Sequence, residues 1–83
     1  MHEIRVLDLD AGRLMVEEGV VKAAVRKLHL VARVTMVADN LAIARQGLMA
    51  SVPIIEVNGV IVSKGKPIIL AEVMELFGRI LPS

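Results

Sequence analysis

Few side chains in this sequence are of the types, and at the spacing, that catalysis or metal binding requires. Asp8 and Asp10 alternate at the end of an apolar stretch, but these two carboxylates supply fewer oxygens than a metal ion takes. Ser51 has no matching histidine–acid pair to activate it, which argues against a hydrolase. The chain has no cysteine, so thiol–disulfide exchange has no thiolate to start it. We therefore expect no catalytic residue, no bound metal and no cofactor.

Two of the polar residues are expected to mark the ends of a helix. Asp10 directly precedes the stretch that begins at Ala11, and an aspartate in this place accepts hydrogen bonds from the first helical turn. A role for Asp10 as a general base is the alternative. His29 follows Leu28 where a helix ends in a left-handed residue, a conformation that histidine adopts more readily than most residues. We interpret both residues as caps.

The pattern of apolar residues and turn residues predicts the order β-α-β-α-β-β-α. An Asn58-Gly59 pair joins the last two strands, because both positions of a type I′ turn need positive φ. Gly65 ends the second of these strands, and Pro67 suits the first turn of the final helix. The predicted elements are strand 4–9, helix 11–28, strand 31–37, helix 41–46, strand 54–57, a strand from 60 to 63 or 64, and a helix that begins near 67.

The first and last helices each have an apolar side and a charged side. The residues expected to face the core are Leu14, Val21, Val25 and Leu28 in the first helix and Ile69, Val73, Leu76 and Ile80 in the last. The apolar residues expected beside them are Val20 and Ala24 in the first helix and Leu70, Phe77 and Leu81 in the last. The residues expected to face solvent are Glu17, Glu18, Lys22, Arg26 and Lys27 in the first helix and Glu72 and Glu75 in the last.

This order of elements predicts one α/β domain over residues 1–83. Two helices connect the first three strands, and the hairpin makes the last two strands antiparallel. The expected architecture is therefore a mixed four-stranded sheet with helices on both faces. A chain of this length buries only about 60% of the surface that its unfolded form exposes, so its stability is expected to be marginal.

The composition is apolar and nearly neutral. Apolar residues make up 55% of the chain, mean hydropathy is +0.67 and net charge is +1. A small domain this apolar is expected to expose apolar patches, which mark interfaces, so we expect a homodimer or a protein partner, with a tightly packed monomer as the alternative. No basic stripe and no run of the ~18 apolar residues that a membrane span needs is present, so neither nucleic acid nor a membrane is an expected partner. The N-terminus lacks the features of a signal peptide, and we expect the cytoplasm.

The element order and the residues at the element ends resemble the small thioredoxin-like proteins known as redox-active disulfide proteins, which are the size of a glutaredoxin. The resemblance covers nearly the whole chain and is most specific in its second half. There the family's glycine, small residue, proline, turn and later glycine are matched by Gly47, Ser51, Pro53, Asn58-Gly59 and Gly65. In the first half, Ala11 takes the place of the nucleophilic cysteine and Leu14 that of the resolving cysteine.

The resemblance implies a binding surface that has lost its redox chemistry. In the family the bond before the proline is cis, which turns the backbone N–H and C=O of the preceding residue toward the head of the first helix. Val52 would make these contacts, with a peptide or with glutathione. The apolar residues expected beside this loop are Ala11, Leu14, Met15, Met49 and Val52. They either seal the former active site into the core or, with Pro53, form a binding patch.

Three hypotheses for function follow. The first is a redox-inactive module that binds a protein or peptide in the groove between Ala11 and Pro53. The second is a structural homodimer that pairs through strand 31–37 or strand 60–63, which the resemblance places at the two edges of the sheet. The third is a glutathione-binding protein of transferase type, in which Arg13 and Lys64 or Lys66 would hold the carboxylates of glutathione.

Overall fold

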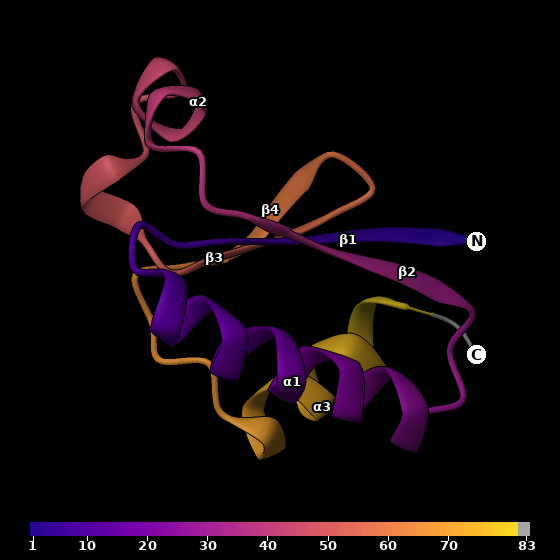
Figure 1. Ribbon diagram of the computed structural model, residues 1–83. Coiled ribbons are helices and arrows are strands. Elements are labelled where there is room, and N and C mark those ends of the chain that lie inside the picture. Colours follow the sequence, from indigo (N-terminus) through magenta and orange to yellow (C-terminus); the bar gives the residue numbers. More distant parts are fainter. Residues whose placement is uncertain (82–83) are drawn as a thin grey trace.

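The elements follow one another in the predicted order, as the computed structural model, which describes residues 1–81, shows (Figure 1). The strands are β1 (His2–Leu7), β2 (Ala32–Val37), β3 (Ile54–Val57) and β4 (Val60–Lys64). The helices are α1 (Ala11–Lys27), α2 (Asn40–Arg45) and α3 (Leu70–Ile80), and a short 3-10 helix, η1 (Met49–Ser51), precedes β3. None of the helices in this part of the chain is both long and apolar enough to cross a membrane.

The four strands form one mixed sheet in the order β2-β1-β3-β4. β1 runs parallel to β2, with Ile4 opposite Val34, and antiparallel to β3, with Val6 opposite Ile55. β3 and β4 pair antiparallel across the hairpin turn. β2 and β4 are therefore the edge strands, as predicted.

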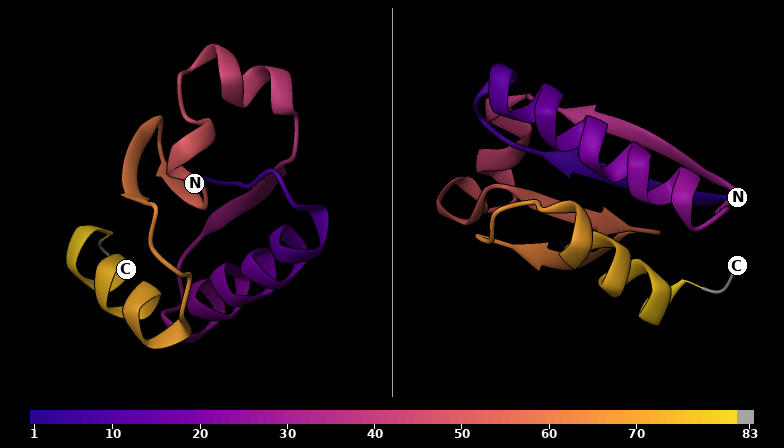
Figure 2. Two further views of the ribbon diagram at one scale, coloured as in Figure 1. Left: turned by 90° about the vertical axis from the view of Figure 1, so that its left-hand side faces the viewer. Right: turned by 90° about the horizontal axis from the view of Figure 1, so that it is seen from below.

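Helices lie on both faces of the sheet, also as predicted (Figure 2). α1 and α3 pack side by side on one face and enclose the larger core. The buried residues of this core are Ile4, Val6, Leu14, Val21, Ala24, Ile55, Val57, Val73, Phe77 and Leu81. α2 lies on the opposite face, where Ile43 packs with Leu7 and Ile54. Because α2 has only six residues, it covers one end of that face.

The expected turns and caps form. Asp10 Oδ1 accepts a hydrogen bond from the backbone N–H of Arg13 at 2.9 Å and so caps α1. His29 follows α1 with a φ of 55°, in the left-handed region. In the hairpin, Asn58 has a φ of 50° and Gly59 a φ of 83°, which are the signs that a type I′ turn requires.

α3 differs from the prediction in its start and in its buried side. It begins at Leu70 and not near Pro67, because the chain before it is extended, with Ile69 at φ −117° and ψ 134°. Val73 is buried, as predicted, and Phe77 is completely buried. Ile69 and Ile80 are exposed, so the prediction that they face the core is wrong.

Candidate functional site

Three segments that are distant in the sequence meet at the N-terminal end of α1. One is the loop between η1 and β3, in which the Val52–Pro53 peptide bond is cis. Another is the connection from β4 to α3, whose Gly65 N–H donates hydrogen bonds to the carbonyl oxygens of Ser51 at 2.7 Å and Pro53 at 3.1 Å. The third is the first part of α1 itself. The hydrogen bonds of Gly65 hold the first two segments together beside the helix.

A groove of about 550 Å³ lies between these segments, and we call it the proline groove. Its lining residues are Arg13, Val16, Glu17, Val52, Pro53, Gly65, Pro67 and Ile68. Most of these residues are apolar, and the two charged ones, Arg13 and Glu17, belong to α1. The volume is in the range of sites that bind small ligands or parts of larger ones.

Val52 presents unpaired backbone groups at the proline groove. Its backbone is extended, with φ −73° and ψ 151°. Within residues 1–81, neither its N–H nor its C=O takes part in a backbone hydrogen bond. Backbone groups in this state pair with water or with a ligand. The residue that the resemblance singled out for backbone contacts is therefore available for them.

Asp8, the residue after β1, is completely buried beside the start of α1. Its Oδ1 accepts hydrogen bonds from the backbone N–H of Leu9 at 2.7 Å and from Nη2 of Arg13 at 2.8 Å. Its Oδ2 accepts a hydrogen bond from Nε of Arg13 at 3.2 Å. This bidentate hydrogen bonding by Arg13 outweighs the effect of burial and lowers the pKa of Asp8 to about 2. Asp8 therefore stays ionised at neutral pH.

Glu17 lies in α1, one turn after Arg13, and has only 9% of its surface exposed. The prediction that Glu17 faces solvent is wrong. Its Oε1 is enclosed and has no hydrogen-bond partner among residues 1–81. Burial raises the pKa of Glu17 to about 7. Neighbouring Asp8 adds to this effect, because its carboxylate can accept a hydrogen bond only from the protonated form of Glu17 and its negative charge opposes ionisation.

Helical spacing could have revealed the position of Glu17. Leu14, Glu17, Val21 and Ala24 follow one another at intervals of three, four and three, and all four are buried. This is the repeat of one helix side. The prediction assigned Glu17 to the solvent because of its charge, although its place in the repeat was that of a core residue.

The residues that were predicted to form one apolar site lie in different places in the structure. Leu14 belongs to the larger core and is sealed from solvent. Ala11, Met15 and Met49 are exposed, but they do not line the proline groove. Val16, which the sequence did not single out, lines the groove on the α1 side. Of the expected apolar patch, only the part contributed by the proline loop lies in the groove.

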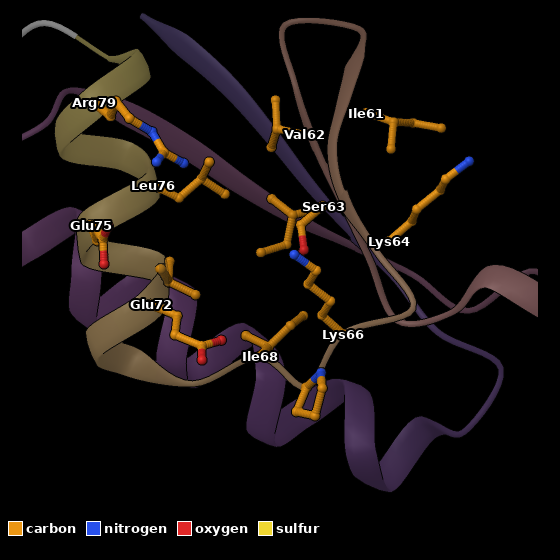
Figure 3. Close-up of a pocket in the computed structure, with 13 residues that line it drawn as sticks. Ile61, Val62, Ser63, Lys64, Lys66, Ile68, Glu72, Glu75, Leu76 and Arg79 are labelled. Carbon is orange, nitrogen blue, oxygen red and sulfur yellow. The ribbon is translucent and has the colours of Figure 1, made fainter.

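A second and larger groove, of about 910 Å³, lies between edge strand β4 and α3 (Figure 3). The charged residues that line this β4–α3 groove are Lys64, Lys66, Glu72, Glu75 and Arg79. Arg13 lines the proline groove instead, where it pairs with Asp8. The cations that the glutathione hypothesis needs together are thus divided between two grooves.

At neutral pH the proline groove contains a carboxyl group that readily exchanges its proton. Such a group can act as a general acid or base, or it can bind a cation. None of the lining residues is a nucleophile, so binding is the use that the geometry favours. Over residues 1–81, no three His, Asp or Glu side chains gather in a way that could hold a metal ion.

Comparison of the chain with protein-family models, with curated proteins and with solved structures finds no match. The function of the protein therefore has to be inferred from the proline groove and from the surfaces around it.

Proposed function

We propose that this protein is a redox-inactive, thioredoxin-like domain of the cytoplasm that binds an extended segment of a protein partner in the proline groove. The element order, the sheet order β2-β1-β3-β4 and the place of the Val52–Pro53 loop beside the start of α1 support the thioredoxin-like assignment. Ala11 and Leu14 stand where the family has its cysteines, so the bound segment undergoes no thiol exchange.

The unpaired backbone N–H and C=O of Val52 are the observation that carries this proposal. A donor and an acceptor on one extended residue can pair with an extended peptide in the way that one strand pairs with the next. Hydrogen bonds of this kind hold the peptide backbone whatever its sequence. Contacts between the peptide's side chains and the walls of the groove would then determine which peptide sequences bind.

The apolar walls of the proline groove suit the side chains of such a peptide. Val16 projects from α1 and has 69% of its surface exposed, which is a large fraction for a valine in a folded domain. Pro53 and Ile68 form other parts of the wall. Burying exposed apolar surface of this kind contributes about 25 cal/mol for each Å² removed from water.

Peptides selected on the domain from a random hexapeptide library test the proposal. We expect Val16→Asp to weaken the binding of the selected peptides by about tenfold to a hundredfold, because the substitution buries an unpaired carboxylate against the peptide. Fluorescence anisotropy of labelled peptides measures this loss. In NMR spectra of the wild type, the amide signal of Val52 is expected to shift on titration.

Val31→Asp is the matched control. Val31 has the same exposed fraction as Val16, 69%, and lies between α1 and β2, at the far end of the helix from the groove. We expect this variant to bind the peptides as the wild type does. Equal binding by Val16→Asp and the wild type would refute the proposal, and so would a Val52 amide signal that stays unchanged at saturation.

Two other substitutions separate the groove from its surroundings. Val52→Asp is expected to abolish binding, but Val52 also packs against the smaller core, so the stability of this variant has to be measured with its affinity. Met49 is exposed outside the groove lining, and Met49→Asp is expected to leave binding unchanged.

A further inference from the structure

Glu17 is the one buried polar side chain of the proline groove whose hydrogen bonding is incomplete. It is nine-tenths buried, it lines the groove, and its Oε1 has no partner within residues 1–81. A buried carboxyl oxygen without a partner is costly, and such groups are uncommon in folded proteins. A cationic ligand group beside the carboxyl group of Glu17 could offset this cost.

The charges around Glu17 define what that ligand group should be. Asp8 and Arg13 neutralise each other through their bidentate pair, and Asp10 is engaged as the cap of α1. Lys64 of β4 and Lys66 of the β4–α3 connection line the other groove. An ionised Glu17 would therefore leave the proline groove with an uncompensated negative charge.

We propose that the proline groove selects peptides that carry a lysine side chain, whose ammonium group binds the carboxylate of Glu17. This inference rests on the proposed peptide-binding function. An ammonium group is a compact charge that can pair with a single oxygen, whereas a guanidinium group is best matched by two oxygens in one plane. Because Oε1 of Glu17 is enclosed, the carboxylate does not offer two oxygens in one plane to a ligand, which favours lysine.

The rest of the groove fits the stem of a lysine. Val16 and Ile68 line the proline groove together with Glu17, and so does Val52, the residue proposed to bind the peptide backbone. Lysine commonly lays its four methylene groups along apolar surface and places its charge beyond them. The ligand chemistry is thus an ammonium group on an apolar chain, presented from an extended backbone.

Binding of a cation at Glu17 is linked to loss of its proton. The groups that face Glu17 and influence it are Asp8, Asp10 and Arg13, and their effect together with burial raises its pKa to about 7. Only the ionised form attracts the ammonium group. The affinity for a lysine peptide is therefore expected to rise by about tenfold from pH 6 to pH 8, in proportion to the ionised fraction of Glu17.

A comparison of two peptides on three proteins tests the inference. The peptides are a library-selected hexapeptide with lysine at the position that faces α1 and the same peptide with norleucine, which keeps the apolar stem and lacks the ammonium group. At pH 8 we expect the wild type to prefer the lysine peptide by about tenfold to a hundredfold. Glu17→Gln, which keeps the shape of the side chain, is expected to bind both peptides equally.

Val16→Asp distinguishes failure of the inference from failure of the proposed function. If the wild type shows no preference for lysine, or Glu17→Gln keeps it, the lysine site is refuted while peptide binding in the groove stands. If no peptide binds the wild type, or Val16→Asp binds the norleucine peptide as well as the wild type does, the proposed function is refuted and the lysine site with it. The pH profile of the wild type is a second test that needs no variant, and an affinity independent of pH from 6 to 8 contradicts the inference.

Discussion

Asp8 and Glu17 are neighbours beside the proline groove, and their pKa values move in opposite directions. Asp8 receives two hydrogen bonds from Arg13, and its pKa falls to about 2. Glu17 receives none from that guanidinium, and its pKa rises to about 7. The guanidinium group of Arg13 is the cation beside both carboxyl groups. Because it pairs with Asp8, it neutralises the charge of Asp8 but not that of an ionised Glu17. Glu17 therefore destabilises the folded protein when it ionises, and a cationic ligand would reverse that effect.

The free energy of unfolding is expected to fall as the pH rises from about 5 to about 8. Folded Glu17 keeps its proton up to about pH 7, whereas in the unfolded chain it loses it near pH 4.5, so the folded state binds more protons in this interval. The expected loss is at most about 3 kcal/mol. Asp8 acts at the other end of the scale, because its stabilising effect disappears as the pH falls from 3.8 to about 2. Urea denaturation at a series of pH values measures both limbs.

Glu17→Gln is expected to flatten the upper limb of this profile. The variant should match the wild type near pH 5 and exceed its stability at pH 8, since glutamine has no proton to lose. Glu18→Gln is the control, because Glu18 is the next residue and makes only a surface ion pair with Lys22 at 3.4 Å. Parallel profiles for the wild type and Glu17→Gln would show that Glu17 does not titrate in this range.

The elements of this protein begin and end at residues with specific backbone requirements. Gly59 has a φ of 83° in the turn between β3 and β4, and Asn58 beside it accepts a hydrogen bond from the backbone N–H of Glu3 at 2.9 Å through its side chain. This bond connects the hairpin turn to β1. Gly19, in contrast, lies in the middle of α1 with nothing within 4 Å of the place that a Cβ would occupy.

The same substitution is therefore expected to have opposite effects at the two glycines. Gly59→Ala should destabilise the protein by about 1–2 kcal/mol, because alanine is strained at positive φ. Gly19→Ala should stabilise it by about 1 kcal/mol, because alanine favours the helix and fits without contact. Urea denaturation of both variants measures these shifts, and a shift of the same sign in both would contradict the assignment of the turn.

The whole molecule leaves two strand edges open, and they differ in how well they are protected. The second residue of β2 is Arg33, whose Nη2 pairs with Oε1 of Glu3 at a distance of 2.6 Å. β4 has an apolar run, Val60–Ile61–Val62, in which Val60 and Ile61 are exposed. Charged residues on an edge strand oppose pairing with another chain, and apolar ones favour it. β4 is thus the edge better suited to pair with a second copy.

We therefore expect the protein to form a dimer through β4 at high concentration. Light scattering across a concentration series should show the mass rising from that of the 9.0 kDa chain toward twice that value. Ile61→Lys is expected to keep the protein monomeric, whereas Met36→Lys on the β2 edge is expected to leave the dimer intact. A constant monomer mass in the wild type would refute pairing of copies, and a dimer lost only in Met36→Lys would place it at β2.

The ends of elements that were predicted correctly are those set by residues close together in the sequence. Asp10, His29 and Asn58-Gly59 mark the ends of elements through the conformations and hydrogen bonds of a few neighbouring residues, so their effects can be recognised without the fold. The start of α3 could not, because Pro67 permits a helix there while the packing of the connection keeps the chain extended to Ile69.

The sequence by itself determined the order of the elements and the turns that end them, because apolar repeats and turn residues act over short distances. The edge strands and the place of the proline loop came from the resemblance. Only the tertiary structure brought Glu17 beside Asp8 and into the lining of the proline groove. It also decided that Val52 and Val16 share a groove while Met15 and Met49 lie outside it. These outcomes depend on contacts between α1, the proline loop and the β4–α3 connection, which are far apart in the chain and meet only in the folded protein.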